Sequence, residues 1–169
     1  LACDAPVIAA IEGNCMGAGV EIASCCDLRV AGTSARFGAP IARLGFPMAP
    51  REARLMGEAL GGLTAREMLL EAAVLDAPTL LLRGFLNAVV ADTDVAGEAF
   101  ARAQRVAALA PQAARLNKQT FRALNQAIPS ADRPRDAMDS IVADAYAYAD
   151  SAEHREGIQA FLGKRKPVF

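Results

Sequence analysis

One stretch near the start of the chain decides the expected fold: Pro6-Val7-Ile8-Ala9-Ala10-Ile11-Glu12-Gly13-Asn14-Cys15-Met16-Gly17-Ala18-Gly19-Val20-Glu21. Residues 6–11 form a continuous apolar run with β-branched members, which predicts a buried strand. Residues 13–19 contain three glycines and predict a turn, after which residues 20–26 predict a short helix. Because the start of a helix leaves backbone N–H groups without partners, this arrangement predicts an anion-binding site.

Three kinds of ligand could occupy such a turn. A nucleotide-binding P-loop ends in Gly-Lys-Ser/Thr, which is absent here. A dinucleotide fingerprint needs Gly-x-Gly-x-x-Gly, whereas the glycines here stand at positions 13, 17 and 19. The third kind is a developing oxyanion, such as a thioester enolate. The carboxylate of Glu21 would repel a phosphate, so we favour the oxyanion.

The acid at Glu21 stands three residues after Ala18, in the first turn of the predicted helix. Positions i and i+3 share a helix face, so the Ala18 amide and the Glu21 carboxylate can address one small volume. A carboxylate beside an oxyanion donor can move a proton next to a polarised carbonyl. The spacing alone leaves a second interpretation open, in which Glu21 only complements the helix dipole.

The chain divides into an α/β part and a helical part. We predict a core over residues 1–92 and a helical region over 93–169, which is apolar enough that it must dock on the core or on a neighbouring subunit. Thr64 and Glu67 predict a capping box at the start of one core helix. The predicted strands are 6–11, 28–31 and 85–90, with an extended piece within 33–38, and the predicted helices are 20–26, 51–60, 64–73, 78–83, 93–109, 111–128, 136–149 and 151–163.

Composition excludes several classes of function. The 169 residues include 18 Lys+Arg and 19 Asp+Glu, and a net charge of −1 is unsuited to nucleic acid, whose binding needs a basic surface. We expect neither a membrane span nor a secretory signal. One histidine and four cysteines without metal-ligand spacing argue against a metal site and against a Ser-His-Asp triad. We therefore expect a cytoplasmic protein with reduced cysteines.

At these residues the sequence resembles the enoyl-CoA hydratase/isomerase (crotonase) family. The family pattern of an apolar strand, Gly-x-x-x-Gly-Gly-Gly-x-Glu and Cys-Asp-hydrophobic-Arg is similar to residues 6–29 here. Phe37-Gly38-Ala39-Pro40 resembles the family's Phe-Gly-x-Pro. The family terminus, Glu-Gly-x-x-Ala-Phe followed by Lys-Arg-x-Pro, is similar to Glu156-Gly157-Ile158-Gln159-Ala160-Phe161 and Lys164-Arg165-Lys166-Pro167-Val168-Phe169.

The resemblance implies a crotonase-like α/β fold built from ββα turns, with residues 93–169 used in assembly of a homotrimer or hexamer. It implies acyl-CoA thioester substrates, so that coenzyme A is part of the substrate and no separate cofactor is expected. The Ala18 amide, beside Gly17, matches an oxyanion-hole donor, and Glu21 matches a catalytic acid/base. Phe161 and Lys164 match positions that approach coenzyme A, although a core aromatic and a solvated basic tail are alternative interpretations.

Two departures from the family pattern affect the expected chemistry. The second catalytic glutamate of the family corresponds to Ile41, which cannot move a proton, and losing such a group typically costs about 10²–10⁴-fold in rate. Glu52, at a predicted helix start, is a candidate substitute, although first-turn glutamates are common in helices. The family also has strands before residues 6–11, so we expect an N-terminal companion, either a second chain or a cleaved segment.

We therefore predict an enoyl-CoA hydratase/isomerase-like enzyme of fatty acid metabolism that stabilises a thioester enolate with Glu21 as its single acid/base. Double-bond isomerisation needs one proton-shuttling carboxylate, whereas hydration normally uses two. The alternative, which Ile41 favours, is a non-catalytic crotonase-like subunit that binds acyl-CoA or serves in assembly. A Rossmann-type nucleotide binder is a third hypothesis, which the glycine spacing disfavours.

Overall fold

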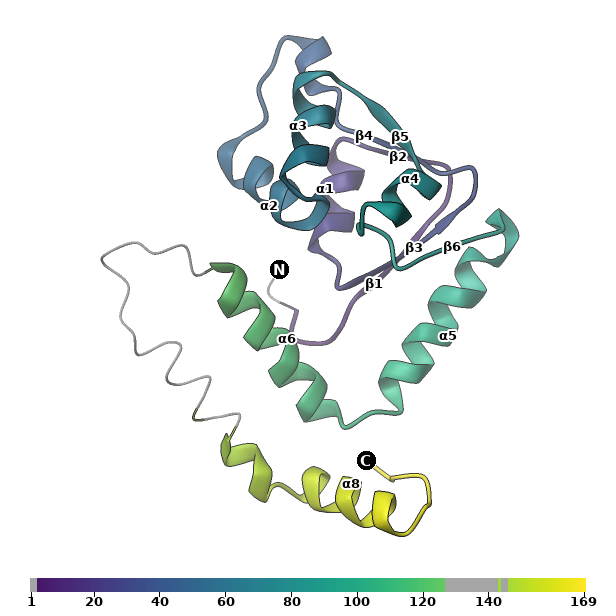
Figure 1. Ribbon diagram of the computed structural model, residues 1–169, viewed down its shortest axis with the longest axis vertical. Helices are drawn as coiled ribbons and strands as arrows, with labels where there is room; N and C mark the ends of the chain where they lie inside the picture. The colour runs from purple at the N-terminus through teal and green to yellow at the C-terminus, as the bar shows by residue number, and fades with distance from the viewer. Residues whose placement is uncertain (1–2, 127–142, 144–145) are drawn as a thin grey trace. The chain divides into compact units, whose positions relative to one another are not determined.

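The structure is a computed structural model that describes residues 3–126, 143 and 146–169. The chain divides into two compact units (Figure 1). The first is made of residues 7–103, and the second joins the segment up to Pro6 with the residues from Gln104 onward. This division falls inside helix α5 (Val95–Ala107), whereas the predicted boundary precedes that helix, and the two-region prediction stays a prediction.

Two small sheets organise the first unit. One sheet has the order β1 (Ile8–Ile11), β3 (Leu28–Gly32), β6 (Ala88–Val90), and all of its strands are parallel. The other has the order β2 (Asn14–Met16), β4 (Arg36–Gly38), β5 (Val74–Asp76), in which β4 is parallel to β2 and antiparallel to β5. Along the chain, successive strands therefore alternate between the two sheets from β1 to β4.

This alternation confirms the predicted ββα turns. Strands β1 and β2 lead into helix α1 (Ala18–Cys25), and β3 and β4 lead through the 3₁₀ helix η1 (Ile41–Leu44) into α2 (Pro50–Leu60) and α3 (Gly62–Leu70). Helix α4 (Ala77–Leu82) follows β5 and leads to β6. Figure 1 shows α1, α2 and α3 as neighbours in this unit, and α2 packs against both of the others.

The local predictions differ from the structure in several places, and the strand β5 was not predicted at all. The glycine-rich stretch 13–19, predicted as a turn alone, contains the strand β2, because Asn14, Cys15 and Met16 pair with β4. Thr64 does not cap α3; it is buried inside the helix, which begins two residues earlier, after Gly61 with φ of 80°. The expected partner, Glu67, forms an ion pair with Arg83.

Aromatic and aliphatic side chains from both sheets fill one core. Phe37 of β4 and Phe85, just before β6, are fully buried and meet edge to face, with ring centroids 6.0 Å apart. Met56 and Leu60 of α2 close the same core, together with Val20 of α1. Such an arrangement holds α1 against the strands by contacts whose loss typically costs about 2–5 kcal/mol for each large side chain truncated to alanine.

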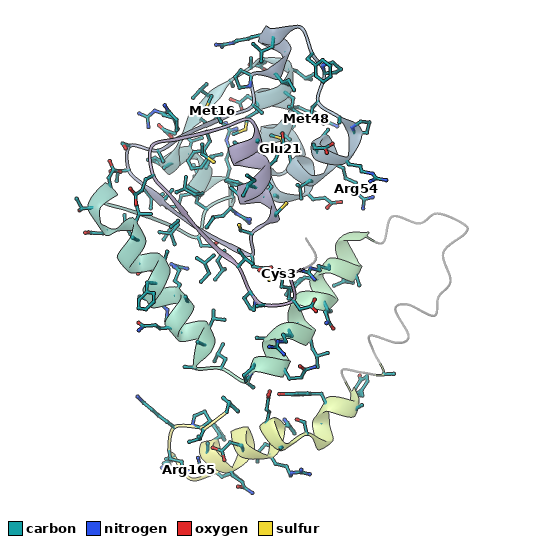
Figure 2. The ribbon with its side chains drawn as sticks, turned by 180° about the vertical axis from the view of Figure 1, so that it is seen from behind. Cys3, Met16, Glu21, Met48, Arg54 and Arg165 are labelled. Atoms are coloured by element: carbon teal, nitrogen blue, oxygen red, sulfur yellow. The ribbon has the colours of Figure 1, made fainter. Side chains whose placement is uncertain are left out.

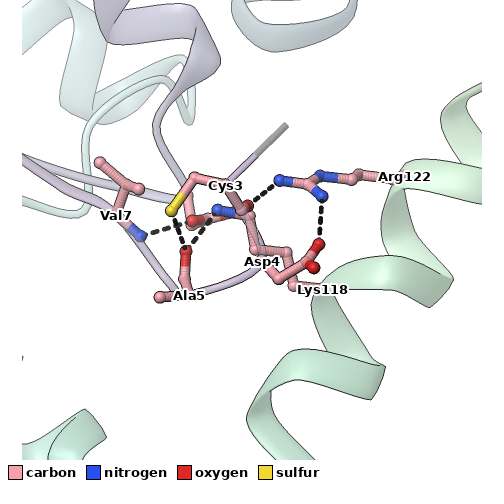
Figure 3. A network of polar contacts seen from close by, with 7 residues as sticks. Cys3, Asp4, Ala5, Val7, Lys118 and Arg122 are labelled. Carbon is pink, nitrogen blue, oxygen red and sulfur yellow. Dashed lines mark hydrogen bonds and ion pairs between the residues drawn. The ribbon is translucent and has the colours of Figure 1, made fainter. Parts of the chain in front are cut away.

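The second unit holds the chain's first residues against helix α6 (Pro111–Gln126). The Lys118 ammonium, in a residue only 8% exposed, donates to the Ala5 carbonyl at 2.7 Å. Arg122 pairs with Asp4 at 3.0 Å and also donates to the Cys3 carbonyl (Figure 3). These bonds fix the segment that leads into β1.

The chain end forms the 3₁₀ helix η3 (Tyr148–Asp150) and helix α8 (Ala152–Leu162), whose N-cap Ser151 accepts from the His154 amide. Glu153 of α8 accepts from the Gln112 amide at the start of α6, at 3.0 Å, and from the Tyr148 hydroxyl at 2.6 Å. Most of the helix predicted over 136–149 lies outside the described residues. The last two residues of the helix predicted over 111–128 lie outside them as well.

Candidate active site

The glycine turn before α1 is built around Gly17. Its backbone has φ of 51° and ψ of −117°, a conformation that L side chains rarely adopt and that therefore favours glycine. The Gly17 amide donates to the Gly38 carbonyl at 2.8 Å, which ties the turn to the end of β4. The Gly17 carbonyl accepts from the amides of Val20 and Glu21, at 2.9 and 3.2 Å. The turn is therefore held from both sides.

The Ala18 amide stands at the first position of α1 and makes no hydrogen bond to another group in the described part of the chain. Of the other amides in the first turn of α1, those of Val20 and Glu21 donate to the Gly17 carbonyl, whereas the Gly19 amide, like that of Ala18, has no partner in the described part of the chain. A free N–H at a helix start, with the positive end of the helix dipole behind it, is a donor suited to an oxyanion.

The Glu21 side chain is half-buried in the first turn of α1. Within residues 3–126, 143 and 146–169 its carboxylate has no hydrogen bond or ion pair. Figure 2 labels it on α1, with Met48 and Arg54 on the neighbouring segment, where Arg54 pairs with Glu58 at 2.6 Å. Glu21 is thus a partly desolvated acid without a structural partner among these residues, three positions after the Ala18 donor.

The position of the family's second glutamate follows the end of β4, the strand to which this turn is bonded. Ile41 is half-buried at the start of η1, three residues after Gly38, whose carbonyl is bonded to Gly17. Glu52 is half-buried in the first turn of α2, the helix that packs on α1. Its role as a substitute stays a prediction.

A cavity of about 350 Å³ lies beside the predicted site rather than at it. Its walls come from β1, β2, the α1 residues Gly19, Ile22 and Ala23 and the C-cap Cys26, and neither Ala18 nor Glu21 lines it. Since a helix advances 100° per residue, these α1 residues face roughly a third of a turn away from Ala18 and Glu21. Burial raises the pKa of the Cys15 thiol, in the same wall, to about 11, so this cysteine stays protonated.

Phe161 and Lys164 belong to the second unit, so their relation to Glu21 of the first unit stays a prediction. Both are exposed, Phe161 by 82%. Phe161 is therefore not the core aromatic that the sequence left open as an alternative. Lys164 has φ of 49°, in the left-handed region that few residues other than glycine adopt.

Sequence reasoning gave no role to Asp27 and Arg29, which the structure places in a network that supports α1. Asp27 accepts from the Val7 amide at 2.6 Å. Arg29 donates to the carbonyls of Phe85 and Cys26, both at 2.6 Å, and its guanidinium lies 4.8 Å from the centre of the Phe85 ring. The sequence feature that could have indicated this role is Cys-Asp-Leu-Arg at residues 26–29. Its aspartate binds the residue before β1, and its arginine joins the C-terminal end of α1 to the segment before β6.

The described residues hold neither a metal-binding cluster nor a membrane-spanning helix. Among these residues, no three His, Cys, Asp or Glu side chains cluster in a way that could hold a metal ion. In the same part of the chain, every helix is too short or too polar to cross a bilayer.

Comparison with known proteins identifies similar sequences over the whole chain. A family model described as enoyl-CoA hydratase/isomerase matches residues 1–169. The chain is 35% identical over 173 residues to the crotonyl-CoA hydratase of Syntrophomonas wolfei subsp. wolfei, with 99% of this chain and 63% of that protein covered. It is 33% identical over 166 residues to the short-chain-enoyl-CoA hydratase of Clostridium acetobutylicum, with 95% and 60% covered.

Solved structures agree with this similarity. An enoyl-CoA hydratase/carnithine racemase from Magnetospirillum magneticum superposes with a TM-score of 0.86 at 36% identity, over 99% of this chain and 60% of that one. Human enoyl coenzyme A hydratase domain-containing protein 3 superposes with a TM-score of 0.82 at 28% identity, over 98% and 63%. The chain thus spans 60–63% of the length of these relatives.

Proposed function

This chain belongs to the enoyl-CoA hydratase/isomerase family, and from that premise we propose that the complete protein acts on an acyl-CoA thioester by stabilising its enolate. The observation that carries the proposal is the pairing of the unsatisfied Ala18 amide with the partnerless Glu21 carboxylate, both held by the Gly17 turn. A donor and an acid three residues apart on one helix face suit proton transfer beside a polarised carbonyl.

In the proposed mechanism the thioester oxygen accepts from the Ala18 N–H while Glu21 removes a proton from the α-carbon. The electron pair of the broken C–H bond enters the carbonyl system, and the enolate oxygen is stabilised by the amide. In a 3-enoyl thioester, returning the proton from Glu21 to the γ-carbon moves the double bond to the 2-position. One carboxylate completes this cycle, and each such group typically contributes about 10²–10⁴-fold.

Isomerisation therefore fits this chain better than hydration. Adding water to a 2-enoyl thioester requires a group that activates water at the β-carbon as well as one that protonates the α-carbon. Ile41 stands at the family's second acid position and can do neither. Glu52 is the described acid we propose as a substitute, if hydration occurs, because it is half-buried in the helix that packs on α1.

Ile41 also supports a second candidate function, a non-catalytic subunit that binds acyl-CoA or serves in assembly. In either case we propose that Gly17 shapes the thioester site and that Phe161 and Lys164 contact coenzyme A. We further propose assembly into a homotrimer or hexamer, since several large apolar side chains of the second unit, among them Phe121 and Leu162, are exposed by more than 60%. A cytoplasmic location stays a prediction.

We also propose an N-terminal companion for the first unit, either a second chain or a cleaved segment. In the described residues, β1 and β2 each pair with one strand only, so each leaves a sheet edge open. The 350 Å³ cavity lies between these strands and α1. Open edges next to an apolar cavity are normally covered in a native protein. Intact-mass measurement of the cellular protein tests this: a mass equal to that of this chain, with no companion peptide, would contradict it.

The test of function compares the wild type with Glu21→Gln in two assays, isomerisation of a 3-enoyl-CoA and hydration of crotonyl-CoA. We expect isomerisation that falls by about 10²–10⁴-fold in Glu21→Gln. Glu71→Gln is the matched control, because Glu71 is exposed and its carboxylate contacts no polar group within the described ranges. Acyl-CoA binding without turnover in the wild type would favour the non-catalytic subunit instead.

A further inference from the structure

The end of helix α8 is closed by a motif that normally contains glycine. The Lys164 amide donates to the Phe161 carbonyl at 3.2 Å, and the Arg165 amide donates to the Ala160 carbonyl at 3.0 Å, which is the bonding pattern of a Schellman cap. In this cap the left-handed position is usually glycine, but here it is Lys164, with φ of 49°. A strained backbone with a charged side chain, kept at a helix end, suggests that the position of that charge matters.

One acid holds the chain beyond this cap. Glu156 accepts from both terminal nitrogens of Arg165, at 2.6 and 2.8 Å, and from the Val168 amide at 2.8 Å (Figure 2 labels Arg165). The Phe169 ring lies beside Gly157, where an added Cβ would be 3.9 Å from it. Residues 165–169 are therefore folded back along α8, and Glu156 binds this tail at two separate points.

The folded tail leaves a cationic and aromatic surface uncovered. Lys164 and Lys166 are exposed, and in the described part of the chain neither side chain forms an ion pair. Phe161, linked to Lys164 by the cap, is exposed by 82%. A planar apolar ring and two ammonium groups suit a ligand that has a heteroaromatic ring and phosphates.

We propose that Glu156 is a positioning residue, which holds the 164–169 tail against α8 so that Lys164 and Phe161 form one rigid surface for the nucleotide end of the acyl-CoA substrate. This inference rests on the proposed function, which supplies the ligand. Glu156 has this role alone among the described acids of α8, because Glu153 is bound to the Gln112 amide and the Tyr148 hydroxyl. Pre-organising the tail before binding reduces the ordering cost that the ligand must overcome.

For Glu156→Gln, the loss of charge and the loss of positioning are expected to change the affinity for coenzyme A in opposite directions. Removing the negative charge of Glu156 from the helix that carries this cationic surface should tighten the binding of an anion if charge alone mattered. If Glu156 positions the tail, the same change should weaken binding. We expect the dissociation constant of free coenzyme A, measured by calorimetry, to rise by about three- to tenfold, because two exposed charge contacts and one ring contact lose their fixed geometry.

Kinetics with two thioesters separates positioning from a general loss of structure. A 3-enoyl-CoA carries the nucleotide, whereas the corresponding N-acetylcysteamine thioester lacks it. Glu156→Gln should raise KM for the CoA thioester by a similar three- to tenfold, with kcat within about twofold, and should leave kcat/KM for the truncated thioester unchanged. The control Glu71→Gln should change neither substrate's parameters.

The outcomes distinguish this inference from the proposed function. If the wild type binds coenzyme A and Glu156→Gln binds it equally or more tightly, the positioning role is wrong while the proposed function stands. Equal losses on both thioesters would also overturn it, since a general structural defect would then explain them. If the wild type binds no coenzyme A and converts neither thioester, the proposed function and this inference fail together.

Discussion

Two glutamates on two helices show how differently one residue type is used in this molecule. Glu21, in the first turn of α1, has no hydrogen bond or ion pair within the described residues. Glu156, in the middle of α8, accepts three hydrogen bonds from the tail that follows the helix. A carboxylate that accepts three hydrogen bonds from the protein stabilises structure, whereas one left without partners beside a free amide is available for a substrate.

Supplying the missing second acid should produce the largest gain of activity. In Ile41→Glu, crotonyl-CoA hydration should rise by about 10²-fold over the wild type, because a group able to activate water then stands at the family's second acid position. The initial rates of crotonyl-CoA hydration by the two proteins measure this rise. Ile41→Gln, of the same size but without an ionisable proton, is the control, and an equal rise in both variants would show that the acid is not responsible.

A smaller effect is expected at Lys164, where stability and binding should move in opposite directions. Lys164→Gly relieves the left-handed backbone, so the free energy of unfolding should rise by roughly 1 kcal/mol. The same change removes an exposed cation, so the dissociation constant of coenzyme A should rise by about two- to fivefold. Thermal unfolding and calorimetry on one sample measure both. Binding that stays unchanged while stability rises would show that Lys164 contacts no ligand.

The sequence predicted the local structure of those parts of the candidate site that lie close together along the chain. The turn, Ala18 and Glu21 fall within a few residues, and the glycine pattern with the helix that follows was enough to place them. Strands β2 and β5 were missed because each has three residues in a stretch without a strand pattern and becomes a strand by pairing with β4. So short a segment carries no periodic pattern of its own.

Long-range contacts explain the rest of what the sequence could not give. Glu156 binds Arg165 and Val168, which lie nine and twelve positions further along the chain in a tail without regular secondary structure. Thr64 and Glu67 have the pattern of a capping box, yet Gly61 starts the helix earlier and Arg83 takes the glutamate. Arg29 binds the Phe85 carbonyl, which the fold alone brings to it. Tertiary contacts override local preference at each of these positions.

The smallest expected effect concerns pH and contrasts the two glutamates directly. Hydrogen bonds from Arg165 and then from the Val168 amide lower the pKa of Glu156 from 4.5 to about 2. Because the folded-state pKa is depressed, the stabilisation is complete above pH 4.5 and is lost as the pH falls from there through 2. NMR titration of the Glu156 carboxyl carbon should give a midpoint near 2. A midpoint near 4.5, the ordinary value, would show that the tail is not bound in solution.

The central claim is that the Ala18 amide and the Glu21 carboxylate act on one thioester. The most direct measurement replaces Ala18 by its α-hydroxy acid analogue, which deletes the N–H and keeps the side chain, and follows 3-enoyl-CoA isomerisation. We predict that kcat falls by about 10²–10³-fold, the usual effect of one lost oxyanion donor, with the fold intact by circular dichroism. An unchanged kcat in the ester protein would contradict the account, because the amide would then have no part in the reaction.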